Sequence, residues 1–192
     1  MPRIGMKNLR YSVVTVSTNE RGVETETYST VKKLARVVSD DVSLNLDKTK
    51  FYCDDVTGEY EPAFIDGTFS AVVAEMANEN IADVNGLTAS EDGDIEFGAD
   101  DSSEYLRVGH TITIIQKGTR YYQGIIYTRV KFDPIYSSGN QTKGESIQYT
   151  PTNLNGEIMA DSRGKWHIVS AWKDTEAAAL TWLDAHLAPS GK

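Results

Sequence analysis

The stretch LRVGHTITIIQKGTRYYQGIIYTRVKF, residues 106–132, decides the fold. β-branched, aromatic and other apolar residues dominate its two halves, 106–116 and 120–132, and this composition is typical of strands. Lys117-Gly118-Thr119 lies between the halves, and a short glycine-containing connection suits a tight turn. The sequence therefore predicts a long antiparallel hairpin.

Strand signals continue on both sides of this hairpin. Val42, Leu44 and Leu46 alternate with polar residues, which is the period of a half-buried strand. We expect a reversal at 47–49, a short return strand at 50–54 and a polar loop at 55–62. A flexible loop is predicted at 137–144. Further strands are predicted at 11–18, 24–29, 33–38, 68–74, 95–97, 147–160 and 166–172.

Two segments have a helical period instead. Ala77, Ile81 and Val84 fall on one helical face, and Gly86 is placed to end that helix, with Leu87 folding back on it. A short final helix is predicted after Asp174 as its N-cap. Its apolar stripe consists of Ala179, Leu180, Leu183 and Leu187.

Strands and helices do not alternate, so a parallel βαβ sheet is excluded. We predict a single, mainly β domain over residues 1–192: an antiparallel β-sandwich or barrel with one flanking α-helix, a short C-terminal helix and an extended β-hairpin loop. Tyr122 and Tyr127 are an odd number of residues apart, so an unbulged strand places them on opposite faces. Both faces of that strand are therefore expected to be covered.

Composition excludes several classes of protein. The chain of 192 residues carries a net charge of −9, which argues against a general grip on nucleic-acid phosphates. Its single cysteine cannot form an internal disulfide. Residues 1–14 lack the apolar core of a signal peptide, and no apolar run could span a membrane. We expect no membrane insertion by this chain.

Cys53-Asp54-Asp55 is the first candidate for chemistry. Two acids beside the thiol would raise its pKa and make it a poorer nucleophile. Neighbouring side chains of a strand also point to opposite faces, so Cys53 and Asp54 would not converge. The favoured interpretation is a small buried cysteine followed by surface acids.

Other candidate sites are equally weak. In the acidic run EDGDIEFGADDSSE, 91–104, the calcium-loop motif counted from Asp92 requires a glycine where Phe97 stands and a glutamate where Ser103 stands. A looser calcium site in that loop stays open. His110, His167 and His186 lack metal-ligand spacing. We expect no catalytic, metal-binding or cofactor-binding residues. We therefore expect that the protein has no cofactor and is not an enzyme.

Four stretches, in order, resemble the major tail proteins of long-tailed bacteriophages (siphophage type), which are tail-tube subunits. They are GMKNLRYSVV (5–14), VSLNLDKTKFYCDD (42–55), the strand from Gly67-Thr68 with the helix at 77–85, and TKGESIQYTPTNLNGEI (142–158). Together they span most of the chain. The sequence departs from the family at Cys53, at Glu145, and in its long acidic loop at 88–104.

The resemblance implies a β-sandwich subunit that joins its own copies in homo-hexameric rings and helical stacks, forming a tube that conducts DNA during ejection without adhering to it. It implies tape-measure and tail-terminator or initiator proteins as partners. It also implies assembly in the bacterial host cytoplasm and a final place in the virion tail. An N-terminal arm (1–8) and an extended hairpin (40–62) would bridge subunits or rings. The candidate contact residues are Lys48, Lys50, Tyr52, Asp54, Asp55 and Tyr60.

Two alternatives stay open at this point. One is a tube subunit of a contractile or secretion-type injection machine. The other is a carbohydrate-binding or adhesive β-sandwich module with exposed aromatic residues.

Overall fold

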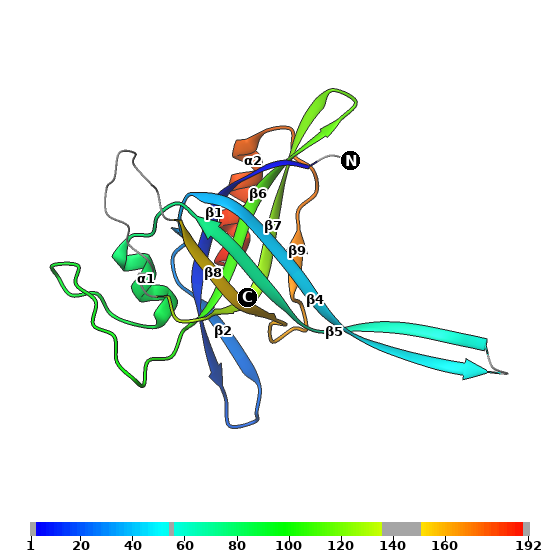
Figure 1. Ribbon diagram of the computed structural model, residues 1–192, viewed down its shortest axis with the longest axis horizontal. Coiled ribbons are helices and arrows are strands. Elements are labelled where there is room, and N and C mark those ends of the chain that lie inside the picture. Colours follow the sequence, from blue (N-terminus) through cyan, green and yellow to red (C-terminus); the bar gives the residue numbers. More distant parts are fainter. Residues whose placement is uncertain (1–2, 54–55, 136–150, 190–192) are drawn as a thin grey trace, which may run out of the picture.

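The computed structural model describes residues 3–53, 56–135 and 151–189, and for 49–61 it describes the backbone alone. The described chain is mainly β (Figure 1). Its strands are β1 (Arg3–Thr18), β2 (Glu24–Tyr28), β3 (Lys32–Lys33), β4 (Val37–Cys53), β5 (Val56–Val73), β6 (Tyr105–Gln116), β7 (Thr119–Phe132), β8 (Thr152–Met159) and β9 (His167–Val169). Its helices are α1 (Asn78–Asn85) and α2 (Glu176–Leu187).

All strand pairs are antiparallel and belong to one sheet, in the order β2-β1-β6-β7-β8-β5-β4, with β3 beside β1 and β9 beside β7. Figure 1 shows β4, β5 and β8 crossing in front of β1, β6 and β7. The sheet thus folds over itself, which is compatible with a β-sandwich. The mainly β, antiparallel prediction is confirmed.

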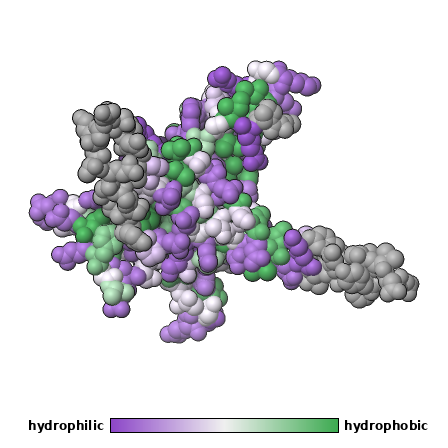
Figure 2. Space-filling model, viewed as in Figure 1, coloured by the Kyte–Doolittle hydropathy of each residue, from purple (hydrophilic) through white to green (hydrophobic). Residues whose placement is uncertain are grey.

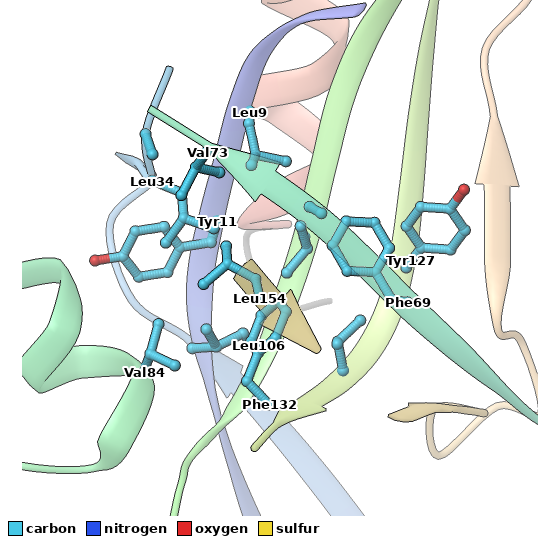
Figure 3. Packing of buried hydrophobic residues seen from close by; sticks show 14 of the residues in the cluster. Leu9, Tyr11, Leu34, Phe69, Val73, Val84, Leu106, Tyr127, Phe132 and Leu154 are labelled. Atoms are coloured by element: carbon cyan, nitrogen blue, oxygen red, sulfur yellow. The ribbon is translucent and has the colours of Figure 1, made fainter. Parts of the chain in front are cut away.

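The main core lies between these two sets of strands (Figure 3). Leu9 and Tyr11 of β1 and Leu106 of β6 are fully buried there against Phe69 of β5 and Leu154 of β8. The Tyr11 hydroxyl leaves the core toward α1, where it donates a hydrogen bond to Asp83 Oδ2 at 2.7 Å and lies 3.0 Å from Asn80 Oδ1. The core therefore fixes both layers and the position of α1.

The opposite face of the β6–β7 hairpin is covered by α2. Leu183 and Leu187 of α2 are fully buried against Ile126 of β7. Tyr127, the next residue of β7, packs in the main core instead. The expectation that both faces of this strand are covered is confirmed.

Helix ends follow the predicted signals closely. Gly86 has φ 69°, and the Leu87 N–H donates to the Ala82 carbonyl at 2.8 Å, so the chain folds back as expected. At α2 the N-cap is Thr175, whose hydroxyl accepts from the Ala178 N–H at 3.2 Å. The prediction of Asp174 as N-cap is wrong by one residue.

The β6–β7 hairpin turns at Lys117-Gly118, as predicted. The predicted arm at 1–8 is wrong from Arg3 onward, because Arg3 pairs with Ile114 at the far end of β6. β1 is irregular there: Gly5 and Asn8 have positive φ, and the register shifts at both places. Because of these bulges, apolar and polar residues do not alternate regularly in this part of β1, and the sequence pattern does not indicate a strand.

Other differences concern short segments. Residues 95–97 form no strand, and the strands predicted at 33–38 and 166–172 are shorter, as β3 and β9. β8 covers the second half of the predicted strand at 147–160. The predicted loop at 137–144 lies outside the described residues.

Candidate functional site

The sheet ends in two open edges. The path of paired strands stops at β4 on one side and at β2 on the other. Within the described part of the chain β4 pairs with β5 alone, so its outer edge from Val37 to Cys53 carries no partner strand. A long edge of unpaired backbone groups is a template for pairing with another chain.

β4 and β5 also form a hairpin that leaves the body of the protein. They pair from Val37 opposite Val73 out to Cys53 opposite Val56. β8 supports β5 only over Gly67–Val73, so among the described residues the outer part of the hairpin consists of these two strands alone (Figure 1). The predicted reversal at 47–49 is therefore wrong, since residues 47–53 continue β4 outward, and the predicted return strand at 50–54 is wrong over these described residues. The predicted loop at 55–62 is wrong from Val56 onward, where the chain belongs to β5. Asp54 and Asp55 lie outside the described residues.

A stack of rings anchors the base of this hairpin. Phe64 of β5 stacks on Trp166 with centroids 4.6 Å apart and planes at 8°. Trp166 stacks on His167, and His167 on Tyr127 of the core, at 4.9 and 5.3 Å. No local sequence pattern predicts this stack, because it joins β5, β7 and the start of β9, which are distant in the chain.

The apolar residues at the base of the hairpin differ in how far they are buried. Val42 packs against the core, as predicted. Leu44 is 41 % exposed and Ile65 is 55 % exposed. Leu44 lies opposite Gly67, and its Cδ2 lies 3.1 Å from the position that a Cβ on this glycine would take. Figure 2 shows apolar surface where the hairpin leaves the body.

The candidate contact residues lie along the outer hairpin. Lys48 is exposed and lies opposite Pro62. Backbone pairing brings Lys50 opposite Tyr60 and places Tyr52 near the end of β4. The side chains of these last three fall outside the description, as do Asp54 and Asp55 entirely.

The solvent-facing side of β4, β5 and β8 is small, polar and acidic. Asp41 lies opposite Ser70, whose hydroxyl donates to Asn155 Oδ1 at 3.0 Å. Thr68 lies opposite Glu157 in the next row. A shallow hollow of about 260 Å³ runs over this face, and the potential of its carboxylates repels phosphate.

His110 is the most buried titratable group near that layer. Its side chain is 2 % exposed, and its Nε2 lies 3.8 Å from Asp40 Oδ2, too far for a hydrogen bond. Burial lowers the pKa of His110 to about 4, helped by His167 and Arg3, and burial raises the pKa of Asp40. His110 is therefore neutral near pH 7.

A polar network fixes β2 at the other edge. Glu26 accepts hydrogen bonds from the Tyr28 hydroxyl at 2.7 Å, from Arg129 Nη2, and from the Ser162 N–H at 3.1 Å. Burial opposes ionisation of Glu26, but these donors outweigh it and hold its pKa below the usual range. The network makes β2 a rigid edge.

The described residues contain neither a metal-binding group of side chains nor a membrane-spanning helix. No group of three or more His, Cys, Asp or Glu side chains could hold a metal ion there. Neither of the two described helices is long and apolar enough to cross a membrane.

Comparison of the chain with protein-family models and with curated protein sequences gives no match.

Proposed function

We propose that this protein is a structural virion protein that assembles with its own copies into stacked hexameric rings, forming the tail tube of a long-tailed bacteriophage. The observation that carries the proposal is the β4–β5 hairpin, which extends beyond the support of β8. The number of subunits in a ring, the stacking and the phage setting come from the resemblance of the sequence motifs.

An isolated two-stranded hairpin is marginally stable in water. The outer part of this hairpin has no third strand within the described chain, yet its two strands stay paired out to Cys53 and Val56. A neighbouring subunit or ring that packs against the hairpin would supply the missing contacts. The length of the hairpin favours a bridge between subunits.

The open edges support lateral assembly. If the outer edge of β4 joins a strand of the next subunit, backbone hydrogen bonds form across the interface and the edge is no longer exposed to unwanted pairing. A contact between two different surfaces closes into a ring when the rotation between subunits allows it.

Charge supports the role of a conduit. The net charge is −9, and the face that carries Asp41 and Glu157 is acidic. DNA passing such a surface is repelled and does not adhere. Transient, non-adhesive passage of DNA is the role we assign. Tape-measure and terminator or initiator proteins are the additional proposed partners, with assembly in the host cytoplasm.

Shortening the hairpin tests this proposal. Leu46 lies opposite Phe64, so residues 47–63 can be replaced by Asn-Gly, which closes a two-residue turn. The shortened protein should melt as cooperatively as the wild type but form no rings or tubes at concentrations where the wild type does. Normal tubes from the shortened protein would contradict the proposed role of the hairpin.

A carbohydrate-binding role has one supporting observation. Trp172 is 39 % exposed, and its ring lies 5.4 Å from that of Tyr121. Such a pair could serve as a platform for a sugar ring. Glycan binding by a protein that stays monomeric, lost in Trp172→Ala, would favour this second function. A tube of a contractile or secretion-type machine differs from our proposal only in its partners, and a neighbouring sheath gene would favour it.

A further inference from the structure

A basic pocket with an apolar floor lies between β1 and the start of β4. It has a volume of about 220 Å³. Met6, Ala35 and Val37 contribute apolar atoms to it, and Ala35 is buried in the main core. The cations that line it are Lys7, Lys33 and Arg36.

Not all of this positive charge is neutralised within the subunit. Lys7 pairs with Glu176 at 3.3 Å, and Arg36 pairs with Glu75 at 2.8 Å. Lys33 is exposed and makes no ion pair within the described residues. In a chain of net charge −9, a basic pocket with apolar atoms and a lysine that has no ion partner among the described residues is suited to receive an acidic group.

The same chain carries a segment of complementary character. Every charged residue from 88 to 104 is acidic. Phe97, between Glu96 and Gly98, is 54 % exposed, and it does not line the pocket of its own subunit. Figure 1 shows the segment after α1 looping out from the body.

We propose that Phe97 of one subunit, carried by the acidic segment 91–101, inserts into the pocket formed by Met6, Ala35 and Val37 of a second copy, with Lys33 facing the acids. The inference rests on the proposed function, since it requires copies that associate. The contact between Phe97 and the pocket would join two copies in addition to the sheet edges and the hairpin.

Size and chemistry agree with this assignment. A cavity of about 150 Å³ accommodates a benzene ring, so a pocket of about 220 Å³ has room for a phenylalanine side chain. Burial removes the exposed ring from water, and charges of opposite sign set the orientation. The two surfaces differ, so the contact runs head to tail and can repeat in a ring or a stack.

Crosslinking between two single-cysteine variants tests the contact. Cys53, the only native cysteine, is replaced by serine, and Lys7→Cys, at the pocket, and Ala99→Cys, in the acidic segment, are made in separate chains, so that Lys33 and Phe97 both stay in place. The two proteins are mixed, assembled and treated with a short bis-maleimide. A crosslinked dimer should form in the mixture and be at least tenfold weaker in either protein alone. Lys7→Cys mixed with Val23→Cys, at an apolar site that is 56 % exposed, is the matched control.

A second pair of variants tests the role of the Phe97 side chain in assembly. Phe97→Ser should lower the yield of assembled particles at least fivefold, while Phe97→Leu should retain most of it. If wild-type particles form but Lys7→Cys crosslinks to Ala99→Cys no better than to Val23→Cys, the contact is wrong and the proposed function stands. If the wild type forms no particles under any condition, the proposed function fails, and this inference with it.

Discussion

Phe64 and Trp166 stack face to face at the point where the β4–β5 hairpin leaves the body, with ring centroids 4.6 Å apart. The stack continues through His167 to Tyr127, so the hairpin is tied to the core by rings as well as by strand pairing. A rigid base gives a projecting hairpin a defined direction. That direction is what a repeated contact between subunits needs.

The first prediction concerns this base. Phe64→Ala should lower the free energy of unfolding by about 2 kcal/mol, because it removes a half-buried ring and its stacking partner. Phe64→Leu should cost less. Ile65→Ala, at the exposed neighbouring position, should change stability by less than about 0.5 kcal/mol and is the control. Urea unfolding measures all three, and equal losses for Phe64→Ala and Ile65→Ala would contradict the anchoring role.

The second prediction concerns the packing of α2 against β7. A Cβ on Gly124 would lie 2.6 Å from Trp182 Cε3. Gly124→Ala should therefore destabilise the protein by about 1–3 kcal/mol. Gly98→Ala, in an exposed loop where the nearest atom is a flexible carboxylate oxygen at 3.2 Å, is the matched control. Trp182→Leu should reduce the cost of Gly124→Ala in a double-mutant cycle, and additive costs would argue against the contact.

The third prediction concerns pH. His110 has a folded pKa of about 4, below its usual unfolded value of 6.5, so the folded state binds fewer protons between these values. Its contribution to stability is present above pH 6.5 and is lost as pH falls through about 4. The full shift corresponds to about 3 kcal/mol.

Other groups near His110 act on the same curve. The pKa of Asp40 is raised in the folded state, so its effect has the opposite sign: stability present at low pH is lost as pH rises through that raised pKa. His110→Gln should make the loss of stability between pH 6.5 and 4 shallower than in the wild type, as measured by urea unfolding at several pH values. Parallel curves for the two proteins would show that His110 does not carry the effect.

The fourth prediction concerns the outer hairpin. Lys48→Glu combined with Lys50→Glu should impair tube formation without lowering the melting temperature, because these lysines are expected to meet acids of a neighbour. The control, Arg21→Glu with Arg120→Glu, makes the same change of charge at exposed sites on other hairpins. Sedimentation velocity measures assembly. Wild-type tubes from the Lys48/Lys50 variant would remove these residues from the interface.

Local signals were enough where the chain follows its own pattern. Gly118 marks the β6–β7 turn and Gly86 ends α1, because both positions have positive φ, which glycine adopts without strain. Of the predicted stripe, Ala179, Leu183 and Leu187 are fully buried and Leu180 is partly buried, since a helix on a sheet needs one apolar face.

The outer hairpin could not be predicted in the same way. A strand with no buried face need not alternate, so residues 47–62 look like a turn, a short return strand and a loop in the sequence. Pro62 also suggested a break, yet within the described residues β5 has no second partner strand there, and proline is tolerated at an open edge. The ring stack of Phe64, Trp166 and Tyr127 depends on tertiary contacts that no local pattern contains.

Negative-stain electron microscopy of the purified full-length protein, over a range of concentrations and with the hairpin-shortened variant beside it, tests the central claim most directly. We expect six-fold rings or tubes of uniform diameter for the wild type and dispersed single subunits for the shortened variant. A wild type that remains dispersed at every concentration, or rings of equal yield from both proteins, would contradict it.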